Sequence, residues 1–254
     1  MKPTFSVIIR TKNERRYLPE VLRRVFAQKI DGSLEVIIVD SGSTDGTLSV
    51  LKKFPVRLIE IPSAEFSYPR ASNIGAAAAE GEYLVYLSGH SLPADEEMLR
   101  KSIVCWRKLE RENASSLAGV YGPVMALPGK GSSRTEKLIF SARRARKARA
   151  HLVEKAKMGI LGCTNAIIRR EIWRKTPFDE AYGLGGEDGA WARERLREGW
   201  GIGFCPALAV YHSHGLGPIN LWRQWRHWKE IAAAREFDRE KMSYRRACPW
   251  RPRN

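Results

Sequence analysis

The sequence predicts an α/β fold in which a mostly parallel central sheet carries helices on both faces. Short runs of β-branched and other apolar residues recur through the first hundred positions, and helical apolar patterns separate them. These runs are apolar at nearly every position instead of alternating, which is typical of parallel strands that are buried on both sides. Polar residues follow most of the runs, and ligands of such sheets bind at the carboxyl ends of the strands.

The first half of the chain contains four of these strands and the helices between them. After the first strand, a helical pattern runs through Leu18, Val21, Leu22 and Val25. The expected strands are residues 5–10, 35–40, 56–61 and 83–87, and the next helices are residues 47–54 and 70–79.

The pattern is less regular beyond residue 100. Gly122 and Pro123 interrupt the strand expected at residues 118–127, and residues 128–133 form a flexible connection to a basic, helical stretch. The other expected elements are a helix at 95–110, a strand at 166–169, a helix at 187–199, strand-like segments within 202–212 and a last helix at 218–241.

Length and composition fit one large domain with a short appendage. The 254 residues are 43% hydrophobic and 28% charged, so we expect a packed core and no global disorder. The opening MKPTFSVIIRT reads as a first strand, not as a signal peptide, and no stretch reaches the roughly 18 apolar residues of a membrane-spanning helix. The four cysteines form no CxxC pair, so we expect neither a thiolate metal cage nor a disulfide framework, and a reducing cytosol fits.

The net charge of +16 is unevenly distributed. Residues 134–157 carry nine Lys/Arg against two acids, and residues 216–254 carry ten against four, so that the remainder is close to neutral. Two local basic surfaces indicate a localised anionic partner. A nucleic-acid-binding protein is an alternative that charge alone suggests, but no nucleic-acid-binding motif is visible, and we expect no nucleic-acid partner.

Polar clusters stand at the strand ends and at two places downstream. Each has a simple structural explanation when taken singly: Asp45 can cap a turn or helix, and Glu187 and Asp188 can favour the dipole of a helix that they open. The clusters are TKNE at 11–14, DSGSTDG at 40–46, SGHSLP at 88–93, GGED at 185–188 and HSH at 212–214.

Together, and in this order, the clusters resemble glycosyltransferase family 2, a large inverting family with a GT-A fold. EVIIVDSGSTDGT is very close to the second strand and donor-binding turn of the family, and the segment with Glu187 and Asp188 resembles its acceptor half. The resemblance spans about residues 5–215 and is nearest to rhamnosyltransferase-like members. It implies a GT-A domain at 1–215, with a nucleotide-sugar-binding half at 1–100 and an acceptor half at 101–215, followed by a basic, tryptophan-rich helix and tail at 216–254.

The resemblance assigns donor binding to residues at the strand ends. Asp40 would accept a hydrogen bond from the pyrimidine ring of the donor, and Thr11 and Glu14 would line the base and ribose. Arg70 would approach the donor phosphates, where a guanidinium suits two oxygens, although it can equally be a solvated helix residue. The full donor set is Thr11, Asn13, Glu14, Asp40, Ser41, Arg70 and Ser88.

Asp188 is the candidate general base. An inverting transfer needs one carboxylate to take the proton of the acceptor hydroxyl as that oxygen attacks the anomeric carbon. Glu187 would orient the acceptor or cap the helix. Trp191 would stack on an acceptor sugar, with core packing as the alternative.

The sequence departs from the family pattern at the metal site. His90 stands where the family places a carboxylate ligand, and His212 or His214 could supply further ligands. Imidazole can ligate manganese, but carboxylate oxygens suit Mg²⁺ or Mn²⁺ better, so metal dependence is open: His90 could also be a positively charged substitute for the cation. A degenerate member that binds nucleotide sugar without catalysis is the alternative function.

The last helix is amphipathic in part. On a helical wheel, Leu221, Trp225 and Trp228 lie together with Trp222 beside them, while Arg223 and other charged residues lie opposite. Such a helix can lie on an anionic membrane surface, and the basic tail would extend the positive field; packing on the domain is the alternative. We therefore expect a cytoplasmic protein that is peripheral on the inner face of the membrane. The family resemblance implies that it acts on a glycan or lipid-linked acceptor.

Overall fold

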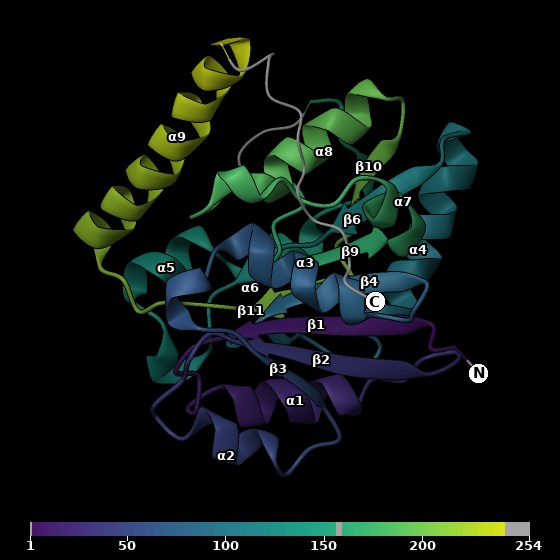
Figure 1. The fold of residues 1–254 in the computed structure, drawn as a ribbon. Coiled ribbons are helices and arrows are strands. Elements are labelled where there is room, and N and C mark those ends of the chain that lie inside the picture. Colours follow the sequence, from purple (N-terminus) through teal and green to yellow (C-terminus); the bar gives the residue numbers. More distant parts are fainter. Residues whose placement is uncertain (1, 156–158, 242–254) are drawn as a thin grey trace.

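A computed structural model describes residues 2–155 and 159–241. In this part of the chain, one central sheet of eight strands has helices on both faces (Figure 1), which confirms the predicted fold class. From one edge to the other the strands are β3 (Arg57–Glu60), β2 (Leu34–Asp40), β1 (Phe5–Thr11), β4 (Tyr83–Ser88), β9 (Asn165–Arg169), β6 (Leu117–Tyr121), β10 (Gly201–Phe204) and β8 (His151–Leu152).

The strands of the first half pair in parallel, as their continuous apolar sequences predict. β1 lies between β2 and β4, and β3 follows on the outer side of β2. The register places Thr11 beside Asp40, and Arg10 beside Ser88. The carboxyl ends of β1, β2 and β4 therefore lie level at one edge of the sheet.

Alternate residues of the strands enter two cores on opposite faces of the sheet. Val7 and Ile9 of β1 pack with α1, α2 and α4, whereas Ile8 packs with α3, α7 and α8. The helices are α1 (Leu18–Phe26), α2 (Thr47–Leu51), α3 (Tyr68–Ala78), α4 (Met98–Asn113), α5 (Arg134–Ile139), α6 (Ala142–Lys147), α7 (Arg170–Lys175), α8 (Glu187–Arg197) and α9 (Pro218–Lys241), with short 3-10 turns η1 (Ser63–Glu65), η2 (Gly129–Gly131) and η3 (Glu180–Tyr182).

A small second sheet lies beside the strand ends. Its order is β5 (Leu92–Pro93), β11 (Val210–Tyr211) and β7 (Val124–Met125). β11 pairs antiparallel with β5 and in parallel with β7. This pairing brings the histidines after β11 next to the segment between β4 and β5.

The second half differs from the expected pattern in three places. The strand expected at 118–127 divides into β6 and β7, which belong to different sheets. The basic stretch forms α5, α6 and the short β8, not one helix. β9 runs antiparallel to both of its neighbours, which a short apolar run cannot reveal, because strand direction depends on the connections.

The helix α9 runs along the outside of the molecule (Figure 1). It has the bounds that the sequence predicts, and the exposed fractions of Trp222 and Trp225 are 53% and 48%. The tail with Arg245, Arg246, Arg251 and Arg253 lies outside the described residues, as does the side chain of Trp228. Among the described helices, none combines the length and the apolar character needed to cross a membrane.

Gly122 separates the two sheets, and its hydrogen side chain is required there. A Cβ atom at this position would lie 1.8 Å from the carbonyl oxygen of Leu208, so the backbone would have to move. We expect Gly122→Ala to lower the free energy of unfolding by about 1–3 kcal/mol, the usual range for overpacking. Gly217→Ala is the matched control, because a Cβ there meets nothing within 4 Å. Denaturant unfolding of both variants measures the effect, and equal stabilities would contradict this packing.

Candidate functional site

The buried carboxylate of Asp40 organises the turn that follows β2. One oxygen accepts hydrogen bonds from the backbone N–H groups of Gly42 (3.0 Å) and Ser43 (2.8 Å). The other accepts from the hydroxyls of Ser43 (2.6 Å) and Thr11 (2.9 Å). All four bonds are internal and Asp40 is fully buried, so a direct contact between this carboxylate and a ligand would require one of these partners to be exchanged.

The loops after β1 and β2 are also joined by their other polar residues. Ser41 is buried, and its backbone N–H and hydroxyl both donate to the carbonyl of Thr11. Asn13 is exposed, adopts a left-handed backbone conformation with φ of 57° and accepts a hydrogen bond from the N–H of Thr44. These two loops therefore form one polar surface at the edge of the sheet.

Arg70 opens α3 near the same edge and is held by carboxylates. Its guanidinium pairs with Glu65 at 2.7 Å and with Glu180 at 3.7 Å. The Nε atom of Arg70 is buried and has no hydrogen-bond partner within residues 2–155 and 159–241. A free anion approaching Arg70 would have to compete with these two pairs.

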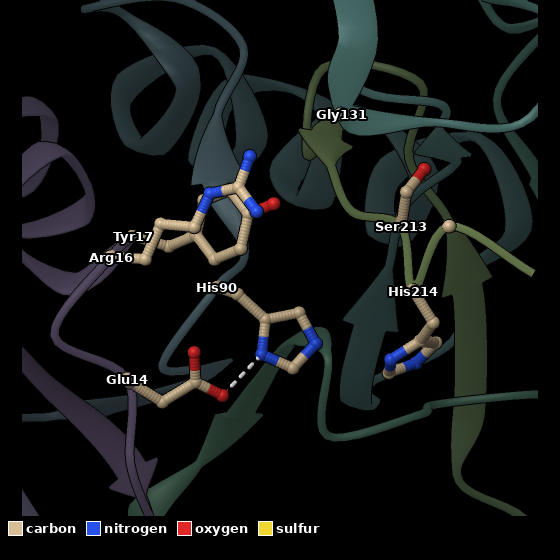
Figure 2. A pocket seen from close by; sticks show the side chains of 8 residues that line it. Glu14, Arg16, Tyr17, His90, Gly131, Ser213 and His214 are labelled. Atoms are coloured by element: carbon tan, nitrogen blue, oxygen red, sulfur yellow. Dashed lines mark hydrogen bonds and ion pairs between the residues drawn. The ribbon is translucent and has the colours of Figure 1, made fainter. Parts of the chain in front are cut away.

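Three histidines meet where the segment after β4 faces the segment after β11. The rings of His90 and His212 are stacked with centroids 4.3 Å apart, and His214 packs edge-on against both. The Nε2 atoms of His212 and His214 are 3.2 Å apart. Glu14 contacts Nδ1 of His90 at 2.5 Å, as Figure 2 shows.

The partial burial of this cluster favours neutral imidazole at His212 and His214. Burial lowers the pKa of His212 well below its ordinary value, and the neighbouring His90 and His214 lower it further. Burial is also the main cause that lowers the pKa of His214. Nδ1 of His212 lies 3.3 Å from the hydroxyl of Ser88 and 3.2 Å from that of Ser91. The prediction placed Ser88 with the donor, and here it also contacts the histidine cluster.

A cavity of about 360 Å³ opens beside the histidines (Figure 2). Its lining joins the loop after β1 to the segments that precede α5 and α9. The lining residues are Glu14, Arg16, Tyr17, His90, Gly131, Ser213, His214 and Gly215.

The second group of the site is a pair of carboxylates at the start of α8. Glu187 is 3% exposed and lies 3.5 Å from the guanidinium of Arg10, which reaches it from β1. Burial, and next the negative charge of Asp188, raise the pKa of Glu187 to about 7. The pKa of Asp188 is also raised by burial, against the hydrogen bonds that it accepts from the backbone of Gly189 and Cys163. Near neutral pH these two adjacent carboxylates can share one proton.

Trp191 lies in the core and not in the site. Its side chain is 3% exposed, its indole N–H donates to the carbonyl of Thr176 at 2.7 Å, and its ring packs edge-on against Phe178. The expectation that Trp191 stacks on an acceptor sugar is corrected accordingly, because the ring has no open face. Asp188 and Trp191 lie within one turn of each other at the start of α8, but only the Trp191 side chain packs in the core.

Two residues of the site were missed in the sequence. Arg10 links the two groups, because it pairs with Glu187 and lies one residue before Thr11. The sequence feature that could have revealed Arg10 is a charged residue within the otherwise largely apolar strand β1. Glu136 is 2% exposed and accepts a hydrogen bond from the backbone N–H of His214 (3.0 Å). Its signal was the capping box with Ser133 at the start of α5.

Comparison with known proteins agrees with this geometry. The sequence profile described as Glycosyl transferase family 2 matches residues 6–176. The O-antigen chain rhamnosyltransferase RfbN of Salmonella typhimurium is 22% identical over 234 residues, which are 87% of this chain and 69% of that protein. A dolichyl N-acetyl-α-D-glucosaminyl phosphate diacetamidodideoxyglucuronosyltransferase of Methanococcus voltae is 30% identical over 142 residues, and this match spans only 44% of its length.

Solved structures show the same fold. Staphylococcus aureus TarS 1–349 in complex with UDP has a TM-score of 0.60 at 21% identity, over 97% of this chain and 73% of that one. The mannosyltransferase PcManGT from Pyrobaculum calidifontis, in complex with GDP-Man and Mn²⁺, has a TM-score of 0.62 at 20% identity, over 96% and 66%. The fold is thus the GT-A fold, and the profile match covers most of the described chain. The chain belongs to glycosyltransferase family 2.

Proposed function

We propose that the protein is an inverting glycosyltransferase that moves a sugar from a nucleoside-diphosphate donor to a glycan or lipid-linked acceptor. The observation that carries the proposal is the carboxylate pair Glu187–Asp188, which Arg10 joins to the polar ends of the parallel strands. Relatives named as rhamnosyltransferases, and structural neighbours bound to UDP-GlcNAc or GDP-Man, support a nucleotide-sugar donor.

The proposed donor half is residues 1–100 and the acceptor half is residues 101–215. In the donor half, the joined loops after β1 and β2 would bind the base and ribose through Thr11, Asn13, Glu14 and Ser41. Asp40 would act chiefly by holding this surface in shape, since all of its present hydrogen bonds are internal.

Asp188 would be the general base. Its carboxylate stands at the amino-terminal end of α8, beside a neighbour whose pKa of about 7 lets it carry the proton of the pair. Two adjacent carboxylates that share one proton leave a single base, which is what inversion requires. Glu187 would position the acceptor hydroxyl.

The three histidines would hold the divalent cation, which when bound would offset the negative charge of the donor diphosphate. The buried Nε2 of His90 fits this assignment, because it has no hydrogen-bond partner among the described residues and lies in a cluster of ligand-type side chains. Ser88 would help to orient His212.

We also propose that the enzyme binds the anionic inner face of the membrane through α9 and α5. Among the side chains that the structure describes on these two helices, five large hydrophobic ones are exposed: Leu138, Ile139, Ile219, Trp222 and Trp225. Exposed basic residues flank them, with Arg226 stacked on Trp222 and Lys229 on Trp225. Exposed tryptophans among cationic side chains suit an anionic lipid surface.

Asp188→Asn tests the catalytic role, because it keeps the shape of the side chain and removes the base. We expect the turnover to fall by about two to four orders of magnitude, as for the loss of a general base, with nearly unchanged donor affinity. Release of nucleoside diphosphate from UDP-, dTDP- and GDP-sugars, with a lipid-linked acceptor extract, measures turnover. Calorimetry measures donor binding.

Asp31→Asn, at an exposed loop position, is the control for this experiment. If Asp188→Asn retained its turnover, Asp188 would not be the base. If it lost donor affinity in proportion, its role would be in binding. A chain that binds donor but shows no turnover before mutation would be the degenerate family member.

The raised pKa of Glu187 predicts a pH dependence of stability. The pKa of Glu187 is about 7 in the folded protein and ordinarily 4.5, so the folded state favours the protonated carboxyl. Its contribution to the free energy of unfolding is fully present below pH 4.5 and is lost as the pH rises through about 7. Relative to Glu187→Gln, the wild type should lose up to about 1.4 kcal/mol of unfolding free energy per pH unit in this window. Denaturant unfolding across the window measures it, with the exposed Glu171→Gln as control. A constant difference between wild type and Glu187→Gln would contradict the raised pKa.

The membrane proposal predicts co-sedimentation with phosphatidylglycerol-containing vesicles that increases with anionic lipid and falls with salt. Trp222→Ser with Trp225→Ser should abolish most of it without changing the circular dichroism. Val104→Ser is the control, since Val104 is 63% exposed on α4. Binding that survives the tryptophan change, or an unfolded double variant, would refute docking through α9.

A further inference from the structure

We propose that His90, His212 and His214 form a three-imidazole site for a transition-metal cation of the Zn²⁺ and Co²⁺ class, and that this site discriminates against Mg²⁺. The proposal deepens the cation role proposed above and rests on it for the function of the metal. The binding itself is argued from the side chains alone.

The ring nitrogens of the three histidines lie close together. One nitrogen from each lies within 4.8 Å of the others. The Nε2 atoms of His212 and His214 are 3.2 Å apart. Two nitrogens bound at about 2.0–2.1 Å to a tetrahedral ion would lie about 3.3 Å apart, so this pair already has the spacing of two zinc ligands.

The other ring nitrogen of His90, Nδ1, is hydrogen-bonded to a carboxylate. Glu14 contacts Nδ1 at 2.5 Å, and both side chains are 17% exposed. A carboxylate that accepts from Nδ1–H leaves Nε2 as the lone-pair nitrogen and makes it a stronger ligand. That Nε2 atom is buried and has no hydrogen-bond partner in the described part of the chain. A buried acceptor prepared in this way fits a cation.

The other two histidines are positioned by equally specific contacts. The hydroxyls of Ser88 and Ser91 flank Nδ1 of His212 and leave its Nε2 for the cluster. The backbone N–H of His214 donates to the buried Glu136. The ligands are thus held by β4, β11 and α5 together, as a site of defined geometry requires.

The chemistry of the donors decides which cation fits. Mg²⁺ prefers six oxygen ligands and keeps much of its water, whereas imidazole suits Zn²⁺, Co²⁺ and similar ions. Here the inward-facing atoms are nitrogens, and Glu14 is engaged with His90. Three histidines with a further open position is the arrangement of reactive zinc sites, and the 360 Å³ cavity at His90 and His214 leaves room for a ligand at that position.

The test is cation binding by the full chain after chelation. Visible absorption of Co²⁺ should show the intense bands of a low-coordinate site, and Zn²⁺ should displace Co²⁺ while millimolar Mg²⁺ does not. His212→Ala and His214→Ala should lose the bands. His151→Ala, which removes an exposed histidine outside the cluster, should keep them.

Two further variants make the result specific to the geometry. Glu14→Gln should weaken Zn²⁺ binding by about 10–100-fold, the usual effect of losing a carboxylate behind a ligand histidine. His90→Asp should shift the preference toward Mn²⁺ and Mg²⁺, because it adds an oxygen ligand. Circular dichroism of each variant separates lost ligands from lost folding.

Weak Co²⁺ bands of a six-coordinate ion, equal competition by Mg²⁺, or the same loss in His151→Ala would overturn the proposal. In that case the three histidines would form only a hydrogen-bonded cluster. The proposed transferase function is measured separately, by UDP binding and sugar transfer in excess EDTA. Full transfer activity in EDTA together with no Co²⁺ site would refute the metal site and support the transferase function. A Co²⁺ site without any sugar transfer would support the metal site and refute the transferase function.

Discussion

The hydrogen bond between Thr11 and Asp40 closes the gap between the ends of β1 and β2, and the arrangement of the polar edge depends on it. Asp40 is fully buried, so the cost of removing its carboxylate from water must be met by its four donors. Three of these donors belong to the turn after β2 and the fourth is Thr11 at the end of β1, so Asp40 joins the two. The loop after β1 carries Glu14, and Glu14 holds His90. One buried carboxylate thus determines the position of residues that do not touch it.

Most of the net positive charge lies in other segments of the chain than the buried Arg10–Glu187 ion pair. Arg10 is the cation that faces the Glu187–Asp188 pair, and its 14% exposed side chain also donates to the carbonyl of Tyr68. The large positive excess lies instead on residues 134–157 and 216–254. Charges at the surface act over a Debye length, whereas the buried pair acts through direct contact. The charge of the basic segments and the buried ion pair therefore differ in the distance over which they act.

The sequence was sufficient for those features that depend on local patterns. The buried strands, the amphipathic α1 and the bounds of α9 follow from which residues are apolar at which spacing. Candidate residues were found because they follow strands. Features that depend on distant pairing were not accessible: the antiparallel direction of β9 and the assignment of β6 and β7 to different sheets. Arg10 was missed because an apolar strand hides a single charge whose partner is 177 positions away.

The position of β9 has a consequence for how the chain reaches this structure. Residues 165–169 pair with β4 on one side and with β6 on the other, so β9 is the strand that joins β6 to the first four strands. During synthesis, β1 to β4 can assemble early, but β4 keeps an unpaired edge over roughly eighty further residues. Unpaired edges can associate with other chains, and late pairing between distant segments is slow. The pairing of β9 with β4 is therefore a step before which a nascent chain needs protection from aggregation.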